Sequence, residues 1–285
     1  MAEMSSTAIA IAGTRAGVPK NRAQLAAKAF FATLQRDLVV TGREFVPFLL
    51  QALMQPLFFL FIFGKVLPGI GLAAGSFASL MLPGIVALTG MIAAMQGVTL
   101  PLVLDLGFAR EIDDRLLAPQ PVWFVSAEKV LFGALRGMVA SSVIFPLGRL
   151  ILGSGFAVRT DRLPELVLMI ILTGFVGSTI GLLMGTIIKP DQISLMFTLI
   201  FTPLLFTGCT YYPWGALGNI RWFQILTLFN PLTYAAEGLR FSMVPRMNGH
   251  DFPTLNFYVI LVALGLSVLL MFVAGTRTFL KRVVT

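Results

Sequence analysis

The densest group of ionisable side chains in this 285-residue chain falls at positions 110–115, where five of six residues are charged. On a short helix Glu111 and Arg115 stand four residues apart and can form an ion pair, while Ile112 and Leu116 share another face. Such a segment is either a solvated loop with a local salt bridge or a docking helix. In a docking helix the apolar face binds a soluble protein and the charges set its orientation.

A second distinctive segment spans residues 211–240 and combines polar residues with many aromatic ones. It is too apolar for a free loop, and Asn230-Pro231 interrupts it. Pro231 suits the first turn of a new helix, because proline has a fixed φ and no amide hydrogen. We therefore expect two short interfacial or re-entrant helices, which are tolerated at membrane depth where protein covers them. The aromatic residues are Trp214, Trp222, Phe223, Phe229 and Tyr234.

Isolated polar side chains interrupt the apolar stretches of the first half of the chain. Gln51, Gln55, Gln96 and Thr99 either line a substrate pathway or form hydrogen bonds between helices. Arg136 lies seven residues beyond Lys129, roughly 10 Å deeper at 1.5 Å per helical residue. An arginine at the bilayer centre costs about 2.5–3.5 kcal/mol on insertion scales. Arg136 therefore either extends to the interface or faces inward and attracts an anionic lipid or substrate.

Several kinds of chemistry are absent from the sequence. No G-x-x-x-x-G-K-[ST] motif occurs, so nucleotide binding through a P-loop is excluded. Cys209 and His250 are the only residues of their types, so we expect no disulfide and no His/Cys metal site. His250 falls in a loop and is expected to be solvated. No predicted span has a central carboxylate, which argues against an ion-driven carrier.

The elements that must position these residues are membrane helices. Long uncharged runs recur along the chain, and about 20 apolar residues cross a bilayer as a helix. The composition agrees, with 57% hydrophobic and 12% charged residues and a mean hydropathy of +0.88; soluble domains carry about 25% charged residues. We predict an all-α polytopic membrane protein with six spans. They lie at about 45–65, 77–104, 128–150, 165–188, 192–210 and 255–276.

The remainder of the chain is short. Residues 1–20 read as a flexible cytoplasmic tail and 21–285 as a single transmembrane domain. An amphipathic stretch precedes the first span and is expected to lie in the membrane interface. The net charge of +8 does not indicate nucleic-acid binding, because the basic residues lie singly between apolar spans. The apolar positions of that stretch are Ala27, Phe30, Phe31, Leu34 and Leu38.

The distribution of Lys and Arg predicts the orientation. With six spans both termini lie on one side, and placing them in the cytoplasm puts thirteen basic residues inside and seven outside. Arg136 lies within a span and is not counted. We therefore expect both termini, and the segment at 110–115, to face the cytoplasm.

Together these segments resemble the type-2 ABC transporter permease family, and its drug-efflux branch most closely. The resemblance covers about 24 to 280. It rests on the charged segment after the second span and on the outer segment before the last. The first comprises Arg110, Glu111, Ile112, Asp113, Asp114, Arg115, Leu116 and Leu117. The second comprises Tyr212, Pro213, Asn230, Pro231, Leu232, Thr233, Tyr234 and Arg240.

The resemblance implies a dimer of permeases, homomeric or heteromeric, in the inner membrane of a bacterium. Two copies of a cytoplasmic ATPase subunit would bind ATP and Mg, while this chain holds no cofactor or metal of its own. The first segment would be the coupling helix to the ATPase, and the second would cap an export pathway for a drug, lipid or lipid-linked glycan. The alternatives are a membrane-embedded lipid-modifying enzyme, for which only Asp105 or Glu128 could serve, and an ATP-independent channel or carrier.

Overall fold

The computed structural model describes residues 22–72, 77–109, 122–153, 156, 158–246 and 251–284, and within these ranges the chain is helical without strands. The main helices are α1 (Arg22–Arg43), α2 (Phe45–Phe61), α3 (Leu67–Gly69), α4 (Phe77–Leu104), α6 (Val122–Leu152), α7 (Leu163–Ile187), α8 (Ile193–Met196), α9 (Thr202–Thr207), α10 (Arg221–Thr227), α11 (Pro231–Met243) and α12 (Phe257–Val284). Three π-helical turns, η1 (Ile62–Val66), η2 (Asp105–Ala109) and η5 (Phe197–Phe201), and two 3₁₀ turns, η4 (Pro190–Gln192) and η6 (Trp214–Asn219), join or extend them.

Five of the helical segments in these ranges are long and apolar enough to cross a membrane. They span Phe45–Gly69, Phe77–Gly107, Trp123–Leu152, Leu163–Ile187 and Phe257–Arg282. Each coincides with a predicted span, so the all-α class is confirmed for the described residues and five of the six predicted spans are helices of sufficient length and hydropathy.

The sixth predicted span, 192–210, has a different form. Its helical part extends only from α8 through η5 to α9, and it is too short to qualify as a span by length. Pro203 has no amide hydrogen to donate to the backbone hydrogen bonds of this helical segment. The segment also contains the π-helical turn η5, where a regular α-helix was expected. A full crossing by this segment therefore stays a prediction.

The core forms around α4. In its most apolar window 78% of the residues are buried, against 22% for the first span and 11% for the last. Small residues allow the backbones to approach closely, as is usual between membrane helices. A Cβ atom added at Gly137 of α6 would lie 2.5 Å from the Gly90 carbonyl oxygen of α4, and one at Gly177 of α7 would lie 2.4 Å from that of Met91. Hence α4, α6 and α7 form the packed centre, and α2 and α12 lie at its periphery.

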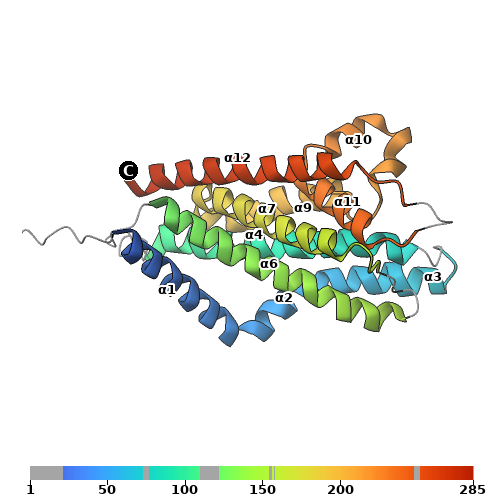
Figure 1. Ribbon diagram of the computed structural model, residues 1–285, viewed down its shortest axis with the longest axis horizontal. Coiled ribbons are helices and arrows are strands. Elements are labelled where there is room, and N and C mark those ends of the chain that lie inside the picture. The colour runs from blue at the N-terminus through green and yellow to red at the C-terminus, as the bar shows by residue number, and fades with distance from the viewer. Residues whose placement is uncertain are drawn as a thin grey trace, which may run out of the picture.

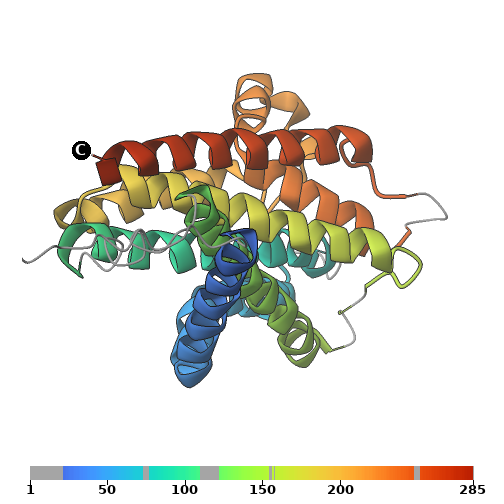
Figure 2. The same ribbon diagram turned by 60° about the vertical axis from the view of Figure 1, so that its left-hand side comes forward.

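Figure 1 shows the long helices running roughly along one direction, with the C-terminal end of α12 and the start of α1 at the same end. Helices α3, α10 and α11 lie toward the opposite end. In the turned view of Figure 2, α1 and α2 project from one side of the bundle. We call the end that holds the start of α1 and the C-terminal end of α12 the basal end, and the opposite end the apical end.

The amphipathic stretch is the helix α1, as predicted, although its apolar residues do not form one buried face. Leu34 is buried, but Phe31 is 65% exposed and Leu38 is 42% exposed. The helix slants away from the bundle along its length (Figure 1) and is tied to α6 near its middle, with the Phe30 and Phe124 rings 6.0 Å apart. Most apolar side chains of its second half, among them Leu38, Val39 and Val40, are exposed.

Candidate functional site

The predicted coupling segment, 110–117, lies outside the described residues, so its helical form stays a prediction. Its two flanks are described: η2 precedes it and α6 follows it, both at the basal end (Figure 1). Gly107 in η2 sits so close to the turn after α7 that an added Cβ would lie 2.2 Å from Pro190 Cγ. The turn η2, which precedes this segment in the chain, is thus held against a second basal turn.

Near the basal end, a cavity of about 560 Å³ separates α1 and α2 from α4 and α6. Its lining includes both signs of charge. Asp37 of α1 accepts from Lys129 of α6 across 2.6 Å, and Arg36 lies 3.2 Å from the same carboxylate. Because Lys129 and Asp37 are largely shielded from solvent, this ion pair fastens α1 to α6 more firmly than an exposed pair would. The other charged groups on the lining are Glu44, Asp105 and Arg136.

Arg136 points into this cavity. Its guanidinium carbon lies 4.3 Å from the centre of the Phe48 ring and 5.8 Å from that of Phe132. Such contacts are worth about 0.5–2 kcal/mol, depending on how far the cation is desolvated. Its Nε is buried and has no hydrogen-bond partner among the described residues. The aromatic rings therefore hold the cation in place while part of its hydrogen-bonding capacity is unused.

The other polar residues considered for a pathway separate into three environments. Gln51 lines this cavity, and both Gln51 and Gln96 line a second cavity of about 300 Å³ that adjoins it. Thr99 is fully buried and donates to the Gly181 carbonyl of α7 at 3.1 Å. Of the two roles considered from the sequence, Thr99 therefore has the interhelical hydrogen bond. Gln55 is exposed on α2. The structure thus brings Gln51, Gln96 and Arg136 together and places Gln55 and Thr99 elsewhere.

At the apical end, the segment 211–240 folds into η6, α10 and α11, so short helices replace a free loop as expected. Asn230 caps α11: its Oδ1 accepts from the Leu232 amide at 2.9 Å, and Pro231 occupies the first turn. The Asn230 Nδ2 donates to the Leu204 carbonyl and to Thr207 Oγ1, both at 2.9 Å. The cap therefore joins α11 to α9, and this role explains why asparagine stands at this position.

Two further residues of the outer segment, Thr233 and Tyr212, donate side-chain hydrogen bonds to backbone carbonyls. Thr233 Oγ1 donates to the Thr227 carbonyl at 2.7 Å and lies 3.1 Å from that of Thr207. The Tyr212 hydroxyl donates to the Phe206 carbonyl. Leu232 is fully buried, while Tyr234 packs at the edge of the main core. Pro213 is the extended residue that precedes η6.

Arg240, near the end of α11, is the largest fully buried side chain among the described residues. Its Nε donates to the Leu80 carbonyl of α4 at 3.1 Å, and one terminal nitrogen donates to Glu237 Oε1 at 2.7 Å. The other terminal nitrogen donates to the carbonyls of Cys209 and Thr210. One guanidinium therefore joins α11, α4 and the chain that follows α9.

Glu237 completes this cluster, and the sequence reasoning did not identify its role. Besides the pair with Arg240, its Oε1 accepts from the Trp214 amide at 2.9 Å. The spacing of three residues between Glu237 and Arg240 on one helix was the available signal. Cys209 adopts a positive φ of 50°, and its carbonyl oxygen accepts a hydrogen bond from Arg240. We call Glu237, Arg240 and the 209–210 carbonyls the buried polar cluster.

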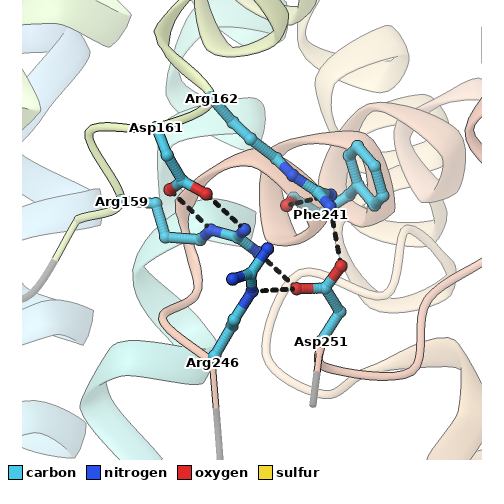
Figure 3. A network of polar contacts seen from close by, with 6 residues as sticks. All are labelled: Arg159, Asp161, Arg162, Phe241, Arg246 and Asp251. Atoms are coloured by element: carbon cyan, nitrogen blue, oxygen red, sulfur yellow. Dashed lines mark hydrogen bonds and ion pairs between the residues drawn. The ribbon is translucent and has the colours of Figure 1, made fainter. Parts of the chain in front are cut away.

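A surface network fixes the loops beside this cluster (Figure 3). Arg159 forms ion pairs with Asp161 at 2.6 Å and Asp251 at 2.8 Å, and Asp251 also pairs with Arg162 and Arg246. These hydrogen bonds from Arg159 hold the pKa of Asp161 at about 2, and those from Arg159 and Arg246 lower the pKa of Asp251. The network joins the loop before α7 to the segments on either side of the 247–250 gap.

The described ranges contain no group of three or more His, Cys, Asp or Glu side chains placed to hold a metal ion. The described residues instead form two basal cavities and an apical helix, α11, that is fixed by buried polar contacts.

Comparison with known proteins defines the class. The family model described as ABC-2 type transporter matches residues 28–244, and the chain belongs to this family. Among its relatives, the inner membrane transport permease YadH of Escherichia coli (strain K12) is 27% identical over 226 residues, covering 77% of this chain and 84% of that protein. The putative transport permease ycf38 of Cyanophora paradoxa is 24% identical over 260 residues, covering 85% of this chain and 86% of that protein.

Proposed function

We propose that this chain is the membrane-spanning permease subunit of an ATP-driven exporter, with ATP and Mg bound by a separate ATPase subunit. The observation that carries the proposal is the ABC-2 family match, which covers four of the five long apolar helices in a chain whose sequence lacks a P-loop. A permease without a nucleotide site must receive the work of ATP hydrolysis through contact with another protein.

The inner membrane of a bacterium is the proposed location. Support comes from the apolar helices and from the name of the relative in Escherichia coli. The basic residues favour an orientation in which the basal end faces the cytoplasm. Single cysteines at Gln120 and Asn248, in a background lacking Cys209, test it with an impermeant thiol reagent in intact cells. Labelling is expected at 248 alone, and labelling at 120 alone would reverse the orientation.

The substrate class that fits best is an amphipathic molecule such as a drug, a lipid or a lipid-linked glycan. The two adjoining basal cavities support this choice, because one is lined by charged groups and the other mainly by apolar ones. Gln51, Gln96 and Arg136 stand at or beside their junction and are the proposed pathway residues.

A second permease copy is expected to complete the pathway. Large apolar side chains on the apical helices support a partner or lipid contact there, since Trp222 is 71% exposed and Phe229 is 82% exposed. Whether that copy is identical to this chain is decided by co-purification of differently tagged copies.

The coupling segment provides the decisive test. Its apolar residues would fill a groove on the ATPase, and buried anchors carry most interface energy while rim charges tune recognition. Leu116→Asp should abolish substrate-stimulated ATP hydrolysis and co-purification of the ATPase, whereas Glu111→Ala should weaken both by less. The elution profile of the permease alone reports whether each variant is folded. Normal assembly and hydrolysis with Leu116→Asp would show that this segment is not the coupling element.

A further inference from the structure

The two basal cavities adjoin each other. The larger cavity and the smaller one share four lining residues, Phe48, Gln51, Pro101 and Arg136. Their volumes of about 560 and 300 Å³ are in the range of small-molecule binding sites. A ligand that occupies both cavities would lie beside Arg136, because this side chain borders each of them.

The two parts differ in chemistry. The larger cavity contains the charged groups near the α1–α2 junction, among them Glu44 and the paired Asp37 and Lys129. The smaller cavity extends along α2 and α4 and, apart from Gln51, Gln96 and Arg136, is lined by apolar residues such as Ala52 and Ala93. A molecule with a charged head and an apolar chain matches this division, since each part would then lie in surroundings of its own polarity.

Arg136 has unused capacity at the junction. Lys129 and Asp37 neutralise each other across 2.6 Å, but Arg136 makes no ion pair within 4 Å among the described residues, and its buried Nε has no acceptor. The ring of Phe48 and the close approach of Gly97, where an added Cβ would lie 3.0 Å from Arg136 Cδ, hold the side chain at the junction. A guanidinium held in this way is suited to a phosphate group, which accepts two parallel hydrogen bonds.

The lining also includes a negative group suited to a cation. Glu44 lies close enough to act on Arg136 electrostatically without forming an ion pair with it. A headgroup that carries a phosphate and an ammonium would therefore meet a charge of opposite sign at each end, whereas a purely anionic headgroup would approach Glu44 unfavourably.

We propose that the basal double cavity binds one phospholipid with a zwitterionic, ammonium-bearing headgroup. The phosphate contacts Arg136, the ammonium lies toward Glu44, and an acyl chain occupies the smaller cavity. The proposal rests on the proposed function for the amphipathic character of the ligand and deepens it by naming the headgroup. Because binding is measured on this chain alone, its failure is distinguishable from failure of ATP-driven export.

Lipid binding is measured by native mass spectrometry of the purified permease, without ATPase or transport, during titration with phosphatidylethanolamine. Arg136→Gln should reduce the apparent affinity by about tenfold or more, because a hydrogen bond to a charged group is lost. Arg136→Lys should retain part of the affinity through its charge. Ala52→Leu, which narrows the smaller cavity, should also weaken binding. Arg149→Gln, an exposed arginine on the same helix, is the matched control and should bind as the parent does.

Three further ligands test which part of the lipid the cavity recognises. Diacylglycerol, which lacks the phosphate, should bind weakly and equally to the parent and Arg136→Gln. Phosphatidylglycerol should bind less tightly than phosphatidylethanolamine, and millimolar inorganic phosphate should not displace the lipid. The proposal is overturned if Arg136→Gln binds phosphatidylethanolamine as the parent does, if phosphatidylglycerol binds more tightly, or if inorganic phosphate displaces the lipid. The temperature at which the buried Cys209 becomes reactive to a thiol reagent is measured for each variant. An unchanged temperature shows that a variant that loses binding is still folded.

Discussion

The buried polar cluster predicts that Arg240 is essential for the stability of the apical end. Its side chain donates to the carbonyls of Leu80, Cys209 and Thr210 and to Glu237, and neither member of the Arg240–Glu237 pair has any exposed side-chain area. Arg240→Met removes all of these donors and leaves the Glu237 carboxylate buried without its partner.

The expected loss follows from the burial. Removing one member of a buried ion pair costs about 3–5 kcal/mol, because the charge that remains is uncompensated. For chains of 150–250 residues each kcal/mol lowers the melting temperature by about 2–4 °C, so Arg240→Met should lower it by at least about 6 °C. Arg240→Lys should recover only part of this loss, because an ammonium cannot reproduce the planar fork that binds several acceptors.

A thiol-reactive fluorophore provides the assay, because Cys209 is the only cysteine and is fully buried within the cluster. Its labelling during a temperature ramp reports opening of this region. Arg246→Met is the matched control: that side chain is 58% exposed, and its surface ion pair is worth little. Glu237→Leu combined with Arg240→Met should be less destabilised than Arg240→Met alone, since no unpaired charge remains. A labelling midpoint for Arg240→Met equal to that of Arg246→Met would refute the reasoning.

Three other expectations follow from the contacts. Gly84→Ala should destabilise the apical end and lower the Cys209 labelling midpoint, because the added Cβ would lie 1.9 Å from the Thr210 carbonyl oxygen, a backbone atom that cannot easily move. The pKa of Asp161 is held near 2 and that of Asp251 is lowered, so the stabilisation by these carboxylates is present above their ordinary pKa and is lost only as the pH falls through the depressed values. Hydrogen-exchange protection of the loop before α7 should therefore be equal at pH 7 and pH 5. The same protection should be lost in Asp251→Asn. Thr99→Val removes one hydrogen bond between α4 and α7 and should cost about 0.5–1.5 kcal/mol in thermal stability, while leaving lipid binding at the basal cavity unchanged.

The amino-acid sequence alone determined which segments are membrane helices. Uncharged runs of sufficient length admit only one backbone solution in lipid, so the helical class and five spans followed from length and hydropathy. It also determined the start of α11, because Asn230-Pro231 is a local signal that combines a capping side chain with a fixed φ. These properties depend on neighbours in the chain and are therefore readable without the fold.

The tertiary structure decided which polar residues act together. Gln51 and Gln55 are four residues apart on one helix, yet only Gln51 faces the basal cavity, because that depends on how α2 packs against α4 and α6. The pairing of Asp37 with Lys129 joins residues far apart in the chain, and no local pattern indicates it. Apart from Glu237, the acceptors of Arg240 are backbone carbonyls of two other segments, which have no signature in the residue types. The sequence could thus predict that charges occur near membrane helices, but only the packing of those helices determines which charges are neutralised and which, like Arg136, face a cavity.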